Sequence, residues 1–197
     1  KVYARWASVK PKTFDRNLVV IGAGAAGLVT SYIAAVVKAK VTLVEKHRMG
    51  GDCLNTGCVP SKALIRTARF LAQARRVRHI GLRSATVDFD FSEVMERVQK
   101  VVADIEPHDS VERYTSLGVE CLQGEARIVS PWSVEIRDSS GKAQILTTRA
   151  IVIAAGARPF IPPIPGIDAV DVLTSDNIWN LRQLPRRLVV LGGGPIG

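Results

Sequence analysis

The sequence predicts an α/β domain with a parallel sheet, joined to an antiparallel three-stranded meander. Two observations carry this prediction. An apolar run at 17–21 is followed by a glycine turn, a helix of small residues and a second apolar run at 40–45, which is the order of a βαβ unit with buried parallel strands. From 126 to 148, short strand-like runs are separated by turn residues, which indicates hairpins.

The first half of the chain is predicted to be mainly helical after this unit. The first helix is expected at 28–38, behind the turn at 22–27. Pro60 suits a first helical turn, because its missing N–H costs nothing there. Valines and an isoleucine recur at helical spacing within 92–106, which predicts an amphipathic helix there. A shorter helix is expected to end at Leu117, because Gly118 follows it. The two longer helices in this part are expected at 61–77 and 92–106.

Strands return in the second half. We expect a parallel strand at 119–122, meander turns at Pro131 and at 138–141, and a buried strand at 150–154. A proline-rich stretch then leads to a last apolar strand at 187–191. Gly192 follows that strand directly, so the turn at 22–27 is echoed near the end of the chain.

Composition and charge exclude several classes of protein. The 197 residues are 47% hydrophobic, which is enough for a core, and three cysteines are too few for a disulfide-stapled secreted scaffold. The net charge of +9 comes from residues 1–16 and from seven Lys and Arg, without an acid, between Asp52 and Asp88. Aromatic residues in these stretches are few, with Phe70 alone in the second one, and they form no array for base stacking, so we expect no nucleic-acid partner.

One uncharged run, 18–37, is long enough to suggest a membrane span. It contains Gly22, Gly24 and Gly27, so we predict a strand, a turn and a helix instead. The basic residues before Asp15 form no folded pattern and are interpreted as a linker, which leaves open a membrane segment upstream of Lys1.

The motif G-A-G-A-A-G at 22–27 predicts a dinucleotide site. Gly22 permits a tight turn, Gly24 lets the backbone approach a pyrophosphate, and Gly27 lets the helix pack closely on the strand. Glu45, at the end of the next strand and 23 residues after Gly22, is placed to accept hydrogen bonds from ribose hydroxyls. Together these features predict a Rossmann-like domain.

Cys53 and Cys58 form a second candidate site. A zinc site would need about two more ligands, and only Cys121 remains. Two inert buried thiols are an alternative. The third interpretation is a redox-active pair, because a helix start near Pro60 and the cation of Lys62 would both lower a thiol pKa. We favour the redox pair beside the dinucleotide site.

Four segments carry a family resemblance. They are G-A-G-A-A-G, G-G-D-C-L-N-T-G-C-V-P-S-K at 50–62, I-V-I-A-A-G-A-R-P at 151–159 and L-G-G-G-P-I-G at 191–197. They closely resemble the class I pyridine nucleotide-disulfide oxidoreductases, the flavoprotein family of dihydrolipoamide dehydrogenase, glutathione reductase and mercuric reductase. The run Gly124–Arg127 is most like the mercuric reductase type.

The resemblance implies a division of the chain and two cofactors. It implies a basic linker at 1–16, the first portion of an FAD-binding domain at 17–183, and the start of a truncated NAD(P)-binding domain at 184–197. FAD would be held by the first glycine turn and by residues of the segments quoted above, and NAD(P)H by the second turn. The residues implied for FAD are Gly22, Gly24, Ala26, Gly27, Glu45, Lys46, Gly51, Asp52, Lys62, Ala126, Ala155 and Gly156, and those for NAD(P)H are Gly192, Gly194 and Gly197.

The implied activity is that of an oxidoreductase. Electrons would pass from NAD(P)H through FAD to a Cys53–Cys58 disulfide and on to a disulfide or metal-ion substrate, with Cys58 next to the flavin and Cys53 facing the substrate. Lys62 would stabilise negative charge. The family implies a homodimer, and residues 1–197 alone would be inactive. The paired cysteines favour the reducing cytoplasm, where a catalytic disulfide is transient. A non-catalytic dinucleotide-binding redox sensor is the alternative.

Two positions depart from the family pattern. Asp52 stands where the family usually has Thr, which places an acid near the flavin or a phosphate. Ala155 replaces the usual Thr of an A-T-G segment. The first change would shift the flavin potential or weaken binding, and the second is mild.

Overall fold

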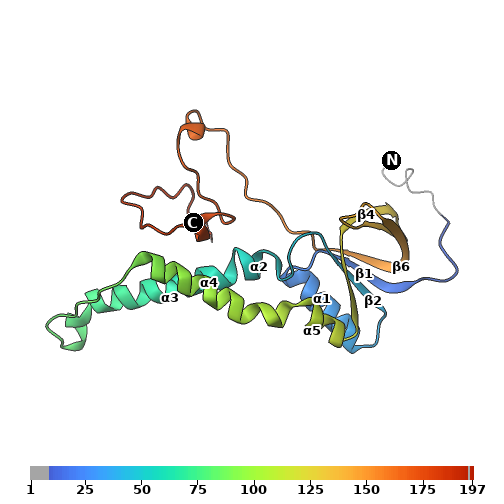
Figure 1. The fold of residues 1–197 in the computed structure, drawn as a ribbon, viewed down its shortest axis with the longest axis horizontal. Coiled ribbons are helices and arrows are strands. Elements are labelled where there is room, and N and C mark those ends of the chain that lie inside the picture. Colours follow the sequence, from blue (N-terminus) through green and yellow to red (C-terminus); the bar gives the residue numbers. More distant parts are fainter. Residues whose placement is uncertain (1–8, 195) are drawn as a thin grey trace.

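A single mixed sheet is the centre of the fold (Figure 1). The computed structural model describes residues 9–194 and 196–197. The strand order is β3-β2-β1-β6-β5-β4, and this confirms the predicted fold class, a parallel sheet with an antiparallel meander. The strands are β1 (Arg16–Ile21), β2 (Val41–Glu45), β3 (Val119–Gln123), β4 (Glu125–Ser130), β5 (Ser133–Arg137) and β6 (Ala143–Ile153).

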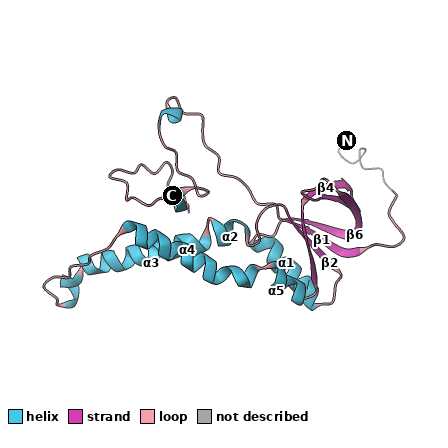
Figure 2. Cartoon of the chain, viewed as in Figure 1, coloured by secondary structure: helices cyan, strands magenta, loops and turns pink. Residues whose placement is uncertain are grey.

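The helices lie to one side of the sheet (Figure 2). They are α1 (Ala25–Val36), α2 (Gly51–Asn55), α3 (Cys58–Arg75), α4 (Phe91–Ile105) and α5 (Val111–Ser116). Among the described residues, four short 3₁₀ helices lie at Val77–Ile80, Glu106–Asp109, Ile167–Ala169 and Ile178–Asn180. In the described part of the chain, no helix is both long enough and apolar enough to span a membrane, and the uncharged run 18–37 folds as β1, a turn and α1.

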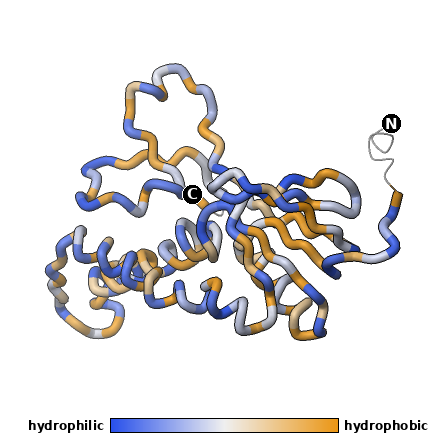
Figure 3. Tube along the Cα trace, turned by 45° about the vertical axis from the view of Figure 1, so that its right-hand side comes forward, coloured by the Kyte–Doolittle hydropathy of each residue, from blue (hydrophilic) through white to orange (hydrophobic). Residues whose placement is uncertain are grey.

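The core lies where the parallel strands are covered. Val19 and Val20 of β1 are fully buried, and Leu43 and Val44 of β2 are nearly so. Burial on both faces explains why these strands read as continuous apolar runs rather than alternating ones. Figure 3 shows this hydrophobic character along the strands, whereas hydrophobic and hydrophilic residues alternate along the helical arm of α3 and α4.

Strand β6 joins two elements that we predicted as separate. Its first residues pair antiparallel with β5, and from Thr148 onward it pairs parallel with β1, up to the register Ile21 with Ile153. No turn residue interrupts 143–153, so the backbone stays extended and only its partner changes. One strand therefore carries the meander directly into the parallel sheet.

Three local predictions were wrong. The glycine-rich loop before Cys58 contains the helix α2, and α3 begins at Cys58, three residues earlier than predicted. The strand predicted at 187–191 is absent, and Val189 is 88% exposed. A strand is held by pairing with a neighbour, and no described segment pairs with 187–191.

The lead-in to β1 is docked on the meander. Phe14 packs against Trp132 with ring centroids 6.0 Å apart, and the Lys10 ammonium lies 4.9 Å from the centre of the same Trp132 ring. The Asp15 carboxylate accepts hydrogen bonds from the backbone and the hydroxyl of Thr147. The predicted basic linker thus makes contacts from Lys10 onward, while its other charged residues Lys1 and Arg5, and Trp6, lie outside the described residues.

Candidate functional site

The turn at 22–27 has a geometry that only glycine permits at two of its positions. Gly22 has φ +102°, and a Cβ built on it would lie 2.2 Å from the Ala154 carbonyl oxygen at the end of β6. A Cβ on Gly27 would lie 1.8 Å from the Gly22 carbonyl oxygen. These contacts bring the start of α1 directly onto the carboxyl ends of β1 and β6, as the spacing predicted.

Gly24 serves a different purpose. It caps α1 with no side-chain hydrogen bond, and a Cβ on it would be an ordinary 3.8 Å from the Gly51 Cα. The amino end of α1, where Ala26 is exposed, therefore keeps free N–H groups and the positive end of the helix dipole. The approach of Gly24 and Gly51 places the two sequence motifs, the glycine turn and the cysteine segment, side by side.

Glu45 is held at the mouth of this turn. Its carboxylate accepts hydrogen bonds of 2.7 Å from the Ala23 N–H and of 2.7 Å from the His47 N–H. The Gly124 N–H donates to the Glu45 carbonyl at 2.8 Å, and so brings the start of β4 to the end of β2. Lys46 and Glu125 form an ion pair of 2.9 Å beside it. The predicted residues Glu45, Lys46 and Ala126 therefore lie close together near the carboxyl end of β2.

Ala155 and Gly156 lie at the same end of the sheet. The Ala155 Cα would lie 3.1 Å from a Cβ on Gly22, and Gly156 has φ +68°. A Cβ on Gly156 would lie 3.7 Å from an Asp52 carboxylate oxygen. Residues that are more than a hundred positions apart in the sequence thus meet where the parallel strands end, which is where ligands bind in open α/β sheets.

The two cysteines flank the junction of α2 and α3. Cys53 lies half-buried in α2, and Cys58 is exposed as the first residue of α3, at the positive end of that helix's dipole. The Asn55 side-chain amide donates to the carbonyls of Met49 and Gly51, at 3.0 and 2.8 Å, and this ties the junction down. Both cysteines are free thiols in this structure.

The cysteine pair is coupled electrostatically. A hydrogen bond with Cys58, burial and the charge of Cys58 together raise the pKa of Cys53 to about 11. Lys62 acts in the opposite direction, as predicted, but more weakly. The expectation of a lowered thiol pKa was therefore wrong for Cys53, because its neighbouring sulfur outweighs the lysine. The effect of Cys58 on this pKa indicates that the two side chains lie close together.

Removal of the Cys58 sulfur should make Cys53 more reactive. In the Cys58→Ala protein, the pKa of Cys53 should fall toward its ordinary value, so the thiolate population at pH 8 rises. We expect the alkylation of Cys53 by iodoacetamide at pH 8 to be about tenfold faster, since higher thiolate content outweighs lower basicity. Site-specific mass spectrometry over pH 7–11 measures the rate. Cys121→Ala is the control, and an unchanged pH midpoint in Cys58→Ala would refute the coupling.

The second glycine turn repeats the first. Gly192 has φ +114°, and a Cβ on Gly197 would lie 2.4 Å from the Gly192 carbonyl oxygen and 3.3 Å from the Val190 side chain. The corresponding contacts of Gly27 are with the Gly22 carbonyl and, also at 3.3 Å, with Val20. This local likeness exists even though no strand precedes the second turn. Gly194 lies inside the turn with open space around it.

Sequence reasoning missed Trp179. It is 8% exposed and packs between α3 and α4 against Ala63, Met95 and Val98. Its indole N–H points to the carbonyl of Thr56, which lies between the two cysteines. The only signal in the sequence was a single tryptophan after the proline-rich stretch, and nothing local links it to the cysteine segment.

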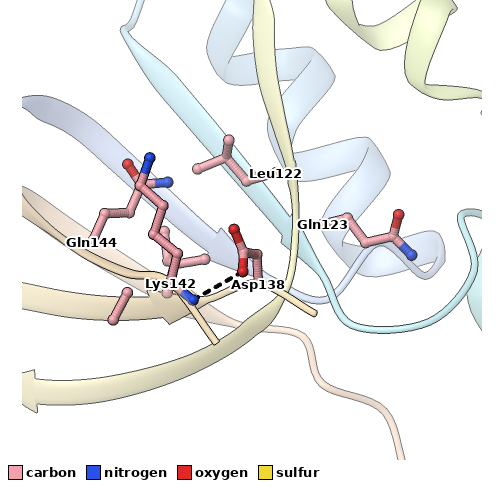
Figure 4. Close-up of a pocket in the computed structure, with 7 residues that line it drawn as sticks. Leu122, Gln123, Asp138, Lys142 and Gln144 are labelled. Atoms are coloured by element: carbon pink, nitrogen blue, oxygen red, sulfur yellow. Dashed lines mark hydrogen bonds between the residues drawn. The ribbon is translucent and has the colours of Figure 1, made fainter. Parts of the chain in front are cut away.

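A small hollow lies elsewhere, on the meander (Figure 4). Its volume is about 210 Å³. Leu122 and Gln123 line it from β3, and the β5–β6 hairpin lines it from the other side, where the Lys142 backbone N–H donates to Asp138 at 3.1 Å. None of the predicted site residues lines this hollow, so it is not the candidate site.

Comparison with known proteins gives a consistent result. Residues 16–197 match the family model described as pyridine nucleotide-disulphide oxidoreductase. The chain is 32% identical to a mercuric reductase of Bacillus cereus over 93% of its length and 28% of that protein, and 38% identical to a dihydrolipoyl dehydrogenase of Geobacillus stearothermophilus over 93% of its length and 38% of that protein. It therefore spans less than half of these relatives.

A solved structure shares the fold. The chain superposes on the HOCl-induced flavoprotein disulfide reductase RclA of Escherichia coli, a cysteine-to-serine mutant in complex with Cu(II), with a TM-score of 0.70. The match covers 88% of this chain and 36% of that one, at 24% sequence identity. At this identity the likeness extends to the fold alone.

Proposed function

The chain belongs to the pyridine nucleotide-disulphide oxidoreductase family, and from this premise we propose that it is part of an FAD-dependent enzyme that reduces a small disulfide or a metal ion with electrons from NAD(P)H. The observation that carries the proposal is the approach of Gly24 to Gly51. It joins a free helix amino end, suited to a pyrophosphate, to the segment that bears two neighbouring thiols.

The residues at the carboxyl end of the parallel strands fit the ADP half of FAD. A Cβ at Gly24 would meet only the Gly51 Cα within 4 Å, so the backbone at the amino end of α1 is accessible to a phosphate. The Glu45 carboxylate lies beside the turn and would accept hydrogen bonds from ribose hydroxyls. Lys46, Ala126, Ala155 and Gly156 would line the rest of the site. When bound, FAD supplies two-electron chemistry between a nicotinamide and a sulfur pair.

The two cysteines have different roles in this proposal. Cys58, exposed at the amino end of α3, would lie toward the flavin, with Lys62 one turn further along the same helix. Cys53 would exchange with the substrate. Its raised pKa means that it holds its proton at neutral pH, so this proton would pass to a base, such as a departing thiolate, before the Cys53 sulfur attacks a substrate.

The remaining parts of the proposal concern the whole protein. NAD(P)H would be bound by the turn of Gly192, Gly194 and Gly197, in a second domain that begins at 184 after an FAD domain at 17–183. Residues 1–197 alone would be inactive, because this second turn has no sheet to rest on in the described chain. We also propose a homodimer in the cytoplasm, where reducing conditions keep a catalytic disulfide transient.

One experiment tests the proposal directly. The protein is expressed from its complete gene, supplied with FAD and freed of unbound flavin, and then treated anaerobically with NADH or NADPH. We expect bound flavin and the appearance of two thiols, at Cys53 and Cys58, by alkylation and mass spectrometry. The control receives no nicotinamide. Failure to take up FAD, or no new thiols after reduction, would reject the enzyme proposal.

A further inference from the structure

The junction between the two cysteines contains a carbonyl that its own helices cannot satisfy. Thr56 is the carboxyl-terminal cap of α2, and α3 begins two residues later. In a continuous helix the Thr56 carbonyl would accept from the N–H of residue 60, but that residue is Pro60, which has no N–H. The turn that sets the spacing of Cys53 and Cys58 therefore needs a donor from outside.

Trp179 supplies that donor. Its indole N–H lies 2.9 Å from the Thr56 carbonyl oxygen and 2.7 Å from the Ser175 carbonyl oxygen, so one N–H is shared by two acceptors. The residue comes from the 3₁₀ helix Ile178–Asn180, which follows the proline-rich stretch and returns to α4 (Figure 1). The contact spans 123 residues of sequence.

The indole ring is itself firmly held. It is 8% exposed and packs on Ala63 of the cysteine-bearing helix and on Met95 and Val98 of α4. The Trp179 backbone carbonyl accepts from the Gln99 side chain at 3.4 Å and from Arg182 at 3.2 Å. A rigid ring with a fixed donor restricts where the Thr56 carbonyl can lie, and hence how the backbone runs from Cys53 to Cys58.

We propose that Trp179 is a positioning residue for the cysteine pair, which holds the Thr56 turn in the geometry from which Cys53 and Cys58 close into a disulfide. The proposal deepens the function proposed above and rests on it. A disulfide forms only within a narrow range of Cα separations, about 4.4–6.8 Å. A loosened turn samples that range less often, so the closed form becomes less favourable relative to the dithiol.

The test is a thiol–disulfide equilibrium that needs no flavin and no turnover. Protein dithiol reacts with oxidised glutathione to give the protein disulfide and two molecules of reduced glutathione: the S–S bond of glutathione breaks, one forms between Cys53 and Cys58, and the two thiol hydrogens pass to the glutathione sulfurs. In Trp179→Phe, which keeps an aromatic ring but loses the N–H, we expect the equilibrium constant for closure to fall about three- to tenfold, the range that one hydrogen bond commands.

Two comparisons keep the test decisive. Trp132→Phe changes a tryptophan on the meander and should leave the equilibrium unchanged. If Trp179→Phe does not fold, Trp179→benzothienylalanine keeps the shape of indole with sulfur in place of the N–H and should show the same fall. A lower unfolding temperature with an unchanged equilibrium constant in either Trp179 variant would overturn the inference. Absence of a Cys53–Cys58 disulfide in the unmodified protein would instead reject the proposed function.

Discussion

Replacement of Cys58 by serine is expected to stop electron flow to the substrate while leaving the fold and the flavin site intact. Cys58 is exposed at the amino end of α3, so a serine hydroxyl fits there without repacking. Serine cannot form a disulfide with Cys53, and no other described cysteine replaces it, since Cys121 lies on β3. We expect NAD(P)H-dependent substrate reduction to fall by at least about a thousandfold, as when a group that the reaction cannot replace is removed.

The measurement has two parts, made on the protein from its complete gene. Steady-state turnover with a small disulfide or a metal ion gives the loss of activity, and absorbance after two-electron reduction gives the second readout. A long-wavelength band from a thiolate beside the flavin should be present in the unmodified protein and absent in Cys58→Ser. Cys121→Ser is the matched control and should retain both. Turnover above a tenth of the unmodified rate in Cys58→Ser would contradict the assigned role.

Replacement of Gly27 by alanine is expected to destabilise the domain by about 3 kcal/mol, as overpacking at a rigid contact does. The new Cβ would lie 1.8 Å from the Gly22 carbonyl oxygen, and the neighbour is backbone that cannot turn away. Either α1 moves off β1 or the turn opens. Because this turn also carries the proposed pyrophosphate site, FAD binding should be lost with stability.

Gly24→Ala is the matched variant that separates the two effects. Its Cβ would meet the Gly51 Cα at 3.8 Å, and Gly24 has φ −78°, which alanine adopts without strain. We expect a stability loss of no more than about 1 kcal/mol, the scale of a changed helix cap, but much weaker FAD binding, because a methyl group would stand in front of the helix amino end.

Urea unfolding gives the stabilities, and quenching of flavin fluorescence gives the affinities. Equal urea midpoints for Gly27→Ala and the unmodified protein would show that the close contact is not limiting. Undiminished flavin binding by Gly24→Ala would place the pyrophosphate away from this turn.

Both glycine turns and the parallel strands were predictable because each depends on neighbouring residues. Gly22 and Gly27 are required by a turn closed within six positions, and β1 and β2 reveal themselves as apolar runs. The strand predicted at 187–191 was wrong because an apolar run forms a strand only when another strand pairs with it, and that pairing does not depend on neighbouring residues.

The features that follow from the sequence alone are local: where the backbone must turn sharply, which runs are apolar enough to be buried, and that two cysteines lie five positions apart beside a helix start. Three features became visible only in the folded chain: β6 changes partners without a break, Gly24 meets Gly51, and Trp179 reaches the Thr56 carbonyl. Such contacts depend on how whole elements pack. The residues that make them are far apart in the sequence, and no local pattern between them predicts the contact.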